Sequence, residues 1–193
     1  MKKLLFALAI PFVVFGCANT QPTSKEKPQF NSILVAPIIN ETSNMEVSDN
    51  LYYQFIKHLD EQGYYTFPMR TVLVALEQEG INEPEMVYDL GPQKLSKLFG
   101  SDAVLFTKIT YWDTKYNVIT STTEAHVEVK IFTKDGEKIL DKKIVQGFSP
   151  NNAQAGILGN VISSAMQRAL PNNDIVALLL AYQLRGELLP GPY

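Results

Sequence analysis

The chain has a single cysteine, Cys17, and only two histidines among its 193 residues. One thiol excludes an internal disulfide, a CxxC redox pair and an iron–sulfur cluster. No HExxH, GxGxxG, GxSxG or phosphate-loop motif is present. We therefore expect a protein that is not an enzyme, with no catalytic residue, no metal site and no cofactor.

The chain also lacks an excess of positive charge. Its 17 Lys and Arg residues are outnumbered by 20 Asp and Glu residues, which gives a formal net charge of -3 at pH 7. Nucleic acids are bound chiefly by Lys and Arg side chains that neutralise phosphates. The sequence therefore predicts no nucleic-acid partner.

The N-terminal apolar run is too short to cross a membrane. Leu4–Val14 follows two lysines, and it is shorter than the roughly 20 residues that a span requires. It has the length of a secretory signal core. Gly16 then precedes Cys17, as in a bacterial lipobox, although Phe15 stands where that pattern more often has a small residue.

We predict that residues 1–16 are a signal peptide and that Cys17 is the lipid attachment site. An ordinary signal peptide followed by a chance cysteine is the alternative, but the only cysteine falls at the lipobox position. Two or more acyl chains give stable anchoring. By analogy with lipoprotein sorting, Ala18 in place of Asp indicates the outer membrane, with the domain facing the periplasm.

The mature chain is predicted to be one domain behind a tether. Residues 18–31 are polar and contain two prolines, which is typical of a flexible segment with a reach of roughly 20 Å. We assign residues 17–31 to the lipidated cysteine and tether, and residues 32–193 to a single globular periplasmic domain.

Hydrophobic periodicity predicts an α/β (α+β) fold with a mixed sheet of about five strands. The expected strands are 32–38, 64–67, 103–112, 124–131 and 138–148, and the expected helices are 48–62, 70–79, 92–99, 155–169 and 174–185. The first strand, helix and second strand form a βαβ unit, and an antiparallel meander follows. Helices pack on the sheet, and the interval 82–90 fits neither period.

Three local predictions accompany this pattern. Ser48 or Asp49 caps the helix 48–62. Val72, Leu73 and Leu76 form the inward face of the helix 70–79. Asp135-Gly136 is a type I′ hairpin turn, so that strand 138–148 returns antiparallel to the strand before it.

The interval Lys115–Lys134 is predicted to be one strand of about 20 residues, against the usual 3–10. Such a strand exposes unpaired backbone, which either a bulge or a second chain must protect. The small-residue stripe Ala155, Gly159 and Ser163 indicates either close helix–sheet packing or a helix contact between chains. With the apolar segment 175–182, these features favour a homodimer.

The histidines are the remaining candidates for chemistry. His58 lies on the helix 48–62, one turn from Glu61. His126 lies between Glu124 and Glu128 on one strand face, which fits either a weak surface metal site or, as we favour, a solvated polar face. The glycines of the segment 156–159 resemble a phosphate loop only loosely, because the lysine is missing.

Several segments together resemble a family of lipoproteins of unknown function whose best-known member is the neisserial GNA vaccine-candidate lipoprotein. The matching segments are Ser32–Pro37, Asn40-Glu41, Gly63–Tyr65, Gly80–Pro84, Leu98–Leu105, Thr114–Tyr116 and Gly191–Tyr193. The resemblance implies a fold similar to the TolB N-terminal domain. It also implies partners among envelope proteins, a CsgG-like lipoprotein among them, and no catalytic residues.

We therefore expect a non-catalytic outer-membrane lipoprotein that serves as an accessory subunit of an envelope export or surface-assembly complex. The alternative is a regulator of peptidoglycan synthesis similar to LpoB, which shares this fold. The short tether argues against the alternative, because a synthase in the inner membrane lies beyond its reach.

Overall fold

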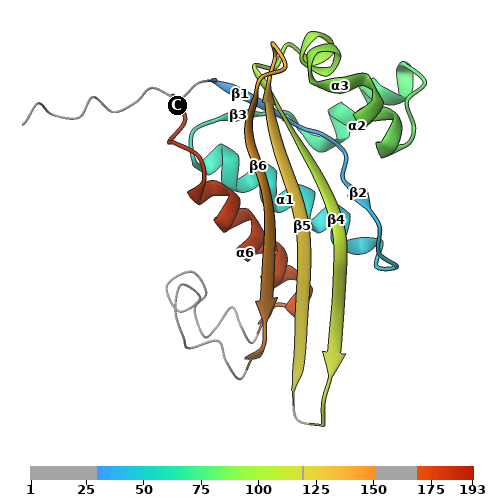
Figure 1. Ribbon diagram of the computed structural model, residues 1–193, viewed down its shortest axis with the longest axis vertical. Coiled ribbons are helices and arrows are strands. Elements are labelled where there is room, and N and C mark those ends of the chain that lie inside the picture. The colour runs from blue at the N-terminus through green and yellow to red at the C-terminus, as the bar shows by residue number, and fades with distance from the viewer. Residues whose placement is uncertain (1–29, 119, 151–168) are drawn as a thin grey trace, which may run out of the picture.

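The computed structural model describes residues 30–118, 120–150 and 169–193. The strands are β1 (Ser32–Val35), β2 (Ile39–Asn40), β3 (Tyr65–Thr66), β4 (Ala103–Tyr116), β5 (Ser121–Thr133) and β6 (Lys138–Phe148), and the helices are α1 (Glu46–Glu61), α2 (Met69–Gln78), α3 (Pro84–Phe99) and α6 (Asn172–Gly186). Long strands β4, β5 and β6 run the length of the molecule (Figure 1).

The sheet is mixed, as predicted. Its order is β3-β1-β4-β5-β6, and β2 pairs separately with β4. The short strands pair in parallel, whereas β4, β5 and β6 form an antiparallel meander. Because α1 connects β1 to the parallel neighbour β3, the predicted βαβ unit is confirmed.

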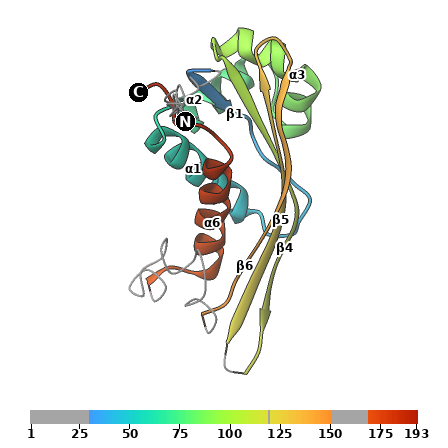
Figure 2. The same ribbon diagram turned by 60° about the vertical axis from the view of Figure 1, so that its left-hand side comes forward.

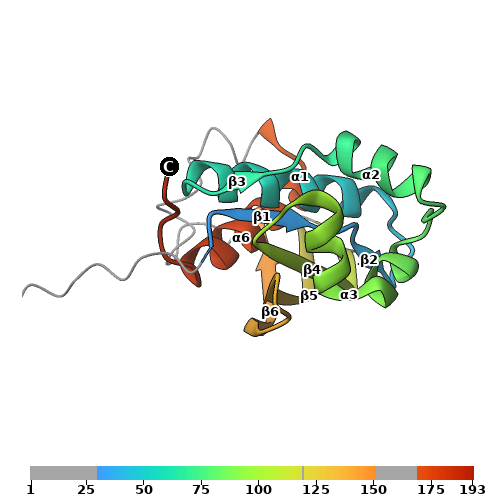
Figure 3. The ribbon, with the colours of Figure 1, turned by 90° about the horizontal axis from the view of Figure 1, so that it is seen from above.

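Helices cover both faces of the sheet. Ile33 and Val35 share one hydrophobic cluster with α1 and α6, whereas Leu34 and Ala36 share a second cluster with α2 and α3. This follows from the two-residue period of a strand that is buried on both faces. Figures 2 and 3 show α6 beside α1, and Figure 3 shows α2, α3 and β2 on the side toward which β1 points.

Strands β5 and β6 and helix α6 agree with the sequence. Ala125, Val127, Val129 and Ile131 are fully buried, and the residues between them are partly or fully exposed. β6 spans the predicted residues 138–148, and α6 extends the predicted helix 174–185 by two residues before it and one after it. Nearly all of the apolar segment 175–182 is buried, so it belongs to the core and offers little contact surface.

The first strand is shorter than predicted, and the predicted helix cap is wrong. Pro37 ends β1 at Val35, because proline has no N–H to donate to a ladder. Helix α1 begins at Glu46 with no side-chain cap. Asn40 closes the preceding loop by donating to the Asn44 carbonyl at 2.8 Å, so the helix starts before Ser48.

Helix α2 corrects the predicted core face, and helix α3 accounts for most of the interval whose structure the sequence left open. Val72 and Leu76 are buried as expected, but Leu73 is 41% exposed and does not belong to the core face. In the ambiguous interval 82–90, Asn82 and Glu83 precede the helix and residues 84–90 are helical; Pro92 starts a second helical segment after a kink at Gly91 (φ 76°, ψ 167°). This conformation is open to glycine because it lacks a Cβ.

The 20-residue strand predicted for Lys115–Lys134 is wrong. β4 continues to Tyr116, the chain reverses, and β5 begins at Ser121 opposite it. The turn is closed by the Asn117 N–H, which donates to the Thr120 carbonyl at 2.8 Å. The sequence has no glycine or proline at this turn. For this reason the end of β4, the turn and β5 together have the sequence pattern of one long strand.

The hairpin at Asp135-Gly136 is confirmed, but its turn is not type I′. That type requires positive φ at both central residues, and no non-glycine residue of the described chain has positive φ. Gly136 alone does, at φ 88°, and its N–H donates to the Thr133 carbonyl at 2.9 Å.

Phe30, the first described residue and part of the segment predicted as the tether, is packed in the domain. Phe30 is only 6% exposed and stacks on Tyr64 with ring centroids 5.0 Å apart. The predicted signal peptide, Cys17, the glycines of 156–159 and all but the last residue of the predicted helix 155–169, including its small-residue stripe, lie outside the described residues. In the part of the chain that is described, no helix is both long and apolar enough to cross a membrane.

Candidate functional site

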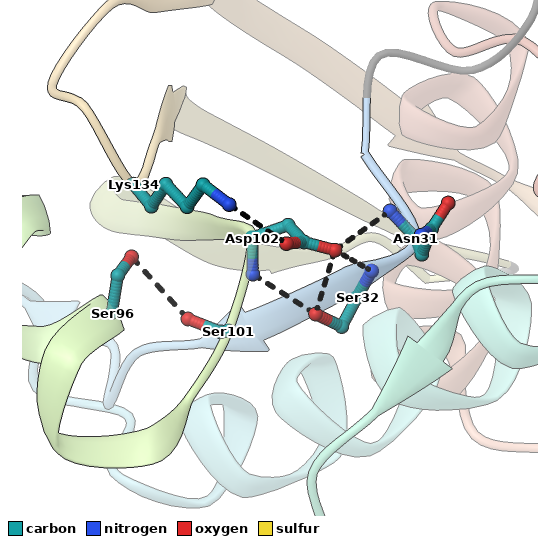
Figure 4. Close-up of polar contacts among 6 residues, drawn as sticks. All are labelled: Asn31, Ser32, Ser96, Ser101, Asp102 and Lys134. Carbon is teal, nitrogen blue, oxygen red and sulfur yellow. Dashed lines mark hydrogen bonds and ion pairs between the residues drawn. The ribbon is translucent and has the colours of Figure 1, made fainter.

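Asp102 fastens the start of the domain to the sheet (Figure 4). Its Oδ2 accepts hydrogen bonds from the backbone N–H groups of Asn31 and Ser32, at 3.1 and 3.3 Å, and from the Ser32 hydroxyl. The Asp102 N–H donates to Ser32 Oγ at 2.9 Å. The carboxylate therefore holds the chain at the point where the predicted tether ends.

The same residue also reaches the β5–β6 turn. Lys134 Nζ lies 3.6 Å from Asp102 Oδ1, and the Lys134 N–H donates to the Asp102 carbonyl at 2.7 Å. Behind this junction, Ser101 and Ser96 are both buried, with their hydroxyls 3.4 Å apart. One aspartate thus joins the N-terminal ends of β1 and β4 to a distant hairpin.

The C-terminal tail is fixed beside this junction. The Gly191 N–H donates to the Gln62 carbonyl at 2.8 Å, and the Tyr193 N–H donates to the Gly63 carbonyl at 3.1 Å. The Gln62 side-chain amide donates to the carbonyls of Arg185, Leu188 and Leu189. Tail and tether junction therefore lie at the same end of the molecule (Figure 1).

Gly63 and Gly191 permit this contact. Gly63 has φ 94°, and a Cβ at that position would lie 2.3 Å from the Tyr193 carbonyl oxygen. A Cβ at Gly191 would lie 2.1 Å from the Gly63 carbonyl oxygen. The segments Gly63–Tyr65 and Gly191–Tyr193, which carry part of the family resemblance, are therefore direct neighbours in space.

The two histidines lie apart. His58 is 7% exposed, and its Nδ1 lies 3.0 Å from the Gln54 carbonyl one turn before it. Glu61 points instead to Arg185, at 3.8 Å. His58 is therefore a buried residue whose ring is hydrogen-bonded to the backbone of its own helix.

His126 and Glu124 form a surface pair, with Nε2 2.7 Å from Oε1. The ring also lies against Tyr111, whereas Glu128 lines a cavity further along the sheet. Within residues 30–118, 120–150 and 169–193, no group of three or more His, Cys, Asp or Glu side chains is placed to hold a metal ion.

That cavity, of about 300 Å³, lies between α3 and the outer face of β4 and β5. Its lining residues are Tyr88, Pro92, Phe106, Lys108, Glu128, Lys130 and Phe132. Lys108 donates to Glu41 at 2.8 Å, and this bond raises the pKa of Lys108. An aromatic floor under a rim of nearly balanced charge suits contact with an apolar group rather than proton transfer.

Tyr88 supplies hydrogen-bond partners for β4 at the point where Pro37 separates β1 from β2. β1 pairs with β4 as far as Leu105, and β2 pairs with it from Lys108 onward. Between them, the Tyr88 hydroxyl accepts from the Thr107 N–H at 2.6 Å and donates to the Thr107 carbonyl. Burial raises the pKa of Tyr88 above its usual range.

Sequence reasoning missed Asp102, Gln62 and Tyr88. None belongs to a motif of known chemistry, and each acts through backbone groups far away in the sequence. The available signal was the resemblance itself, because Asp102 lies in the segment Leu98–Leu105 and Gln62 precedes the segment Gly63–Tyr65.

The chain matches a known protein family over most of its length. The family described as "Putative lipoprotein GNA1162-like" matches residues 22–189. A protein of Neisseria meningitidis serogroup B described as "Putative lipoprotein NMB1124/NMB1162" is 26% identical over 174 residues, which cover 87% of this chain and 81% of the relative.

Solved structures of other proteins have a similar fold. The crystal structure of lipoprotein GNA1162 from Neisseria meningitidis is similar with a TM-score of 0.59 and 27% identity, covering 72% of this chain and 96% of that one. The PelC dodecamer from Paraburkholderia phytofirmans is similar in fold alone, with a TM-score of 0.53, 11% identity and coverage of 84% and 90%. The chain belongs to the GNA1162-like family of lipoproteins.

Proposed function

We propose that this lipoprotein is a non-catalytic accessory subunit of an envelope export or surface-assembly complex, anchored in the outer membrane through lipid on Cys17. Membership of a lipoprotein family supports the anchor. The lipobox pattern around Cys17 and the alanine after it support its place and its membrane.

The observation that carries the proposal is the direction in which the domain extends. The junction at Asp102 and the C-terminus lie at one end, and the β4–β5 hairpin projects beyond the helices at the other (Figures 1 and 2). β4 has 14 residues, so it spans about 45 Å. At its tip Tyr116 is 82% exposed and Val118 is fully exposed, which offers a contact surface far from the anchor.

The length of the tether supports partners close to the anchoring membrane. Phe30 is packed in the domain, and residues 18–29 lie between it and Cys17 in the sequence. A segment of this length spans at most about 40 Å when fully extended. This disfavours the alternative of an LpoB-like regulator, whose target lies in the opposite membrane.

The anchor is tested by replacing Cys17. We expect Cys17→Ser to abolish palmitate labelling and to leave a precursor that retains residues 1–16. The matched variant Ala18→Asp keeps the cysteine, so it should still be labelled but fractionate with the inner membrane. Labelling of Cys17→Ser would overturn the lipid site, and an unchanged location of Ala18→Asp would contradict the sorting argument.

The partner-binding role is tested by site-specific photo-crosslinking in cells. A photoreactive residue replaces Val118 at the hairpin tip, and a control replaces Asp60 at the anchored end of α1. We expect defined adducts with another envelope protein from position 118 but not from position 60. Adducts with a peptidoglycan synthase would favour the alternative role, and no adduct at either position would refute a partner-binding function.

Self-association is a further part of the proposal. The similar PelC structures are dodecamers, and on this chain residues 110–116 of β4 pair only with β5 within the described part of the molecule. We propose a homodimer formed along this free edge.

A further inference from the structure

Two adjoining cavities lie where the parallel strands β1 and β3 end. They have volumes of about 330 and 440 Å³, and they share Pro37, Leu73, Glu83 and Pro84. Shared walls make them one elongated groove, which we call the acidic groove. In open α/β sheets, ligands bind in the crevice beyond the carboxyl ends of the strands, and the groove occupies this place.

The floor of the acidic groove is apolar and partly exposed. Leu76 and Val87 form a buried base. Above it, Met45 is 72% exposed and Leu73 is 41% exposed. A contiguous exposed apolar surface rimmed by polar residues is typical of an interaction site, and methionine adapts its shape to a partner.

The rim carries charge of one sign. Asp49, Glu77, Glu83 and Glu85 line the groove, and no Lys, Arg or His does. The ion pairs found among the described residues all involve other carboxylates. In the same residues, no acidic group is compact enough to chelate a metal ion. The negative charge is therefore available to a larger cation.

We propose that the acidic groove binds a basic amphipathic helix of a partner protein, an inference that rests on the proposed partner-binding function and specifies the chemistry of that partner. Such a helix presents an apolar stripe flanked by Lys and Arg. The stripe would cover Met45 and Leu73, and the flanking cations would meet the rim carboxylates. Nucleic acids and anionic lipids are repelled by the same charge.

The position of the groove suits a partner that binds while the lipoprotein is anchored. β1 begins at the junction with the tether and runs toward β2, α2 and α3 (Figure 3). The acidic groove lies among these elements, at the far end of β1 from the junction with the tether.

The test measures binding of a designed peptide to the purified mature chain by fluorescence anisotropy. The probe is an amphipathic Leu/Lys peptide of about 18 residues, which exceeds the roughly 12–15 residues below which an isolated helix is marginal in water. Two further probes isolate its properties: the same peptide with Glu for Lys, and a lysine oligomer without apolar residues. We expect the Leu/Lys peptide to bind most tightly and to weaken with added salt.

The decisive variant is Glu77→Lys with Glu83→Lys. Lysine at position 77, in the last turn of α2, is compatible with the helix dipole, whereas lysine at position 83, the N-cap of α3, opposes it at a cost of about 0.3–1 kcal/mol. This cost is small beside the stability of a domain, and circular dichroism checks that the variant is folded. We expect binding of the Leu/Lys peptide to weaken by about tenfold or more. The control, Asp60→Lys with Glu137→Lys, makes the same change in net charge away from the groove and should alter binding by less than about twofold.

Equal weakening by both variants would overturn the groove and leave only net charge as the cause. Equal binding of the lysine oligomer would overturn the apolar part of the proposal. These failures are distinct from failure of the proposed function, because crosslinks from position 118 do not depend on the acidic groove.

Discussion

Asp102 shows at the scale of one residue how a surface carboxylate can organise a fold. It accepts three hydrogen bonds from Asn31 and Ser32 and lies near Lys134. We expect Asp102→Ala to lower the free energy of unfolding by about 1–3 kcal/mol, because the N–H groups at the start of β1 lose their acceptor.

Urea unfolding of the mature chain measures this loss, with Asp102→Asn as the matched control. Asparagine keeps one acceptor oxygen and removes the charge, so most of the stability should remain. If Asn proves as damaging as Ala, the charge and its contact with Lys134 matter more than the hydrogen bonds to β1.

Buried tyrosines make stability depend on pH in the alkaline range. Burial raises the pKa of Tyr52, Tyr64 and Tyr88 above the ordinary value of 10.0. Above about pH 10 the unfolded chain releases these protons before the folded chain does. The stabilising contribution is therefore complete below that pH and is lost as pH rises further.

We expect Tyr88→Phe to make the alkaline fall in unfolding free energy shallower, because one of these groups is removed. Tyr116→Phe is the control, since Tyr116 is 82% exposed, and it should leave the slope unchanged. Unfolding by urea at several pH values between about 8 and 11 gives the slopes. Equal slopes in all three proteins would contradict the role of burial at Tyr88.

At the scale of elements, hydrophobic periodicity predicted those helices and strands in which burial follows one regular pattern from end to end. β5 alternates cleanly because one face is wet, and α6 is apolar because it is buried almost throughout. The β4–β5 turn was missed because Asn117 and Thr120 close it without a glycine. Contacts such as Tyr88 with Thr107 depend on tertiary packing, which no local pattern encodes.

The C-terminal tail packs against the chain at Gly63, where a side chain would collide with it. Gly63 and Gly80 both have positive φ, but only Gly63 faces another backbone. Alanine at either site should cost roughly 1–2 kcal/mol in backbone strain. Gly63→Ala should cost more, because its Cβ would collide with Tyr193 and displace the tail.

A chain that ends at Leu189 supplies the comparison for this prediction. With the tail removed, Gly63→Ala and Gly80→Ala should destabilise by similar amounts in urea unfolding. If the excess cost at Gly63 persists in the shortened chain, the tail contact is not its cause.

At the scale of the whole molecule, the sheet leaves β4 with a free edge. β1 and β2 cover β4 as far as Ile109, and among the described strands only β5 pairs with residues 110–116. An exposed edge invites pairing with another chain. The sequence suggested a homodimer because of one long strand. The structure instead offers the free edge of residues 110–116 of β4 as the place where a second copy could pair.

The charges along this edge are self-complementary. If two copies pair antiparallel with Thr114 opposite Thr114, Asp113 lies opposite the second copy's Lys115, and the two-fold axis repeats the pair. Opposite charges at facing positions stabilise a ladder, and like charges destabilise it. Asp113 and Lys115 are both exposed in the single chain, and the Asp113 carboxylate accepts only a long hydrogen bond from the Tyr111 hydroxyl, at 3.4 Å, so both charges are accessible to a second copy.

Analytical ultracentrifugation of residues 18–193 tests the dimer. We expect Asp113→Lys to weaken it, because Lys then faces Lys, and Lys115→Asp to weaken it for the converse reason. The double exchange, Asp113→Lys with Lys115→Asp, restores opposite charges across the axis and should restore association. A wild-type chain that stays monomeric at high micromolar concentration would refute the dimer, and a dimer unaffected by either single change would move the contact away from β4.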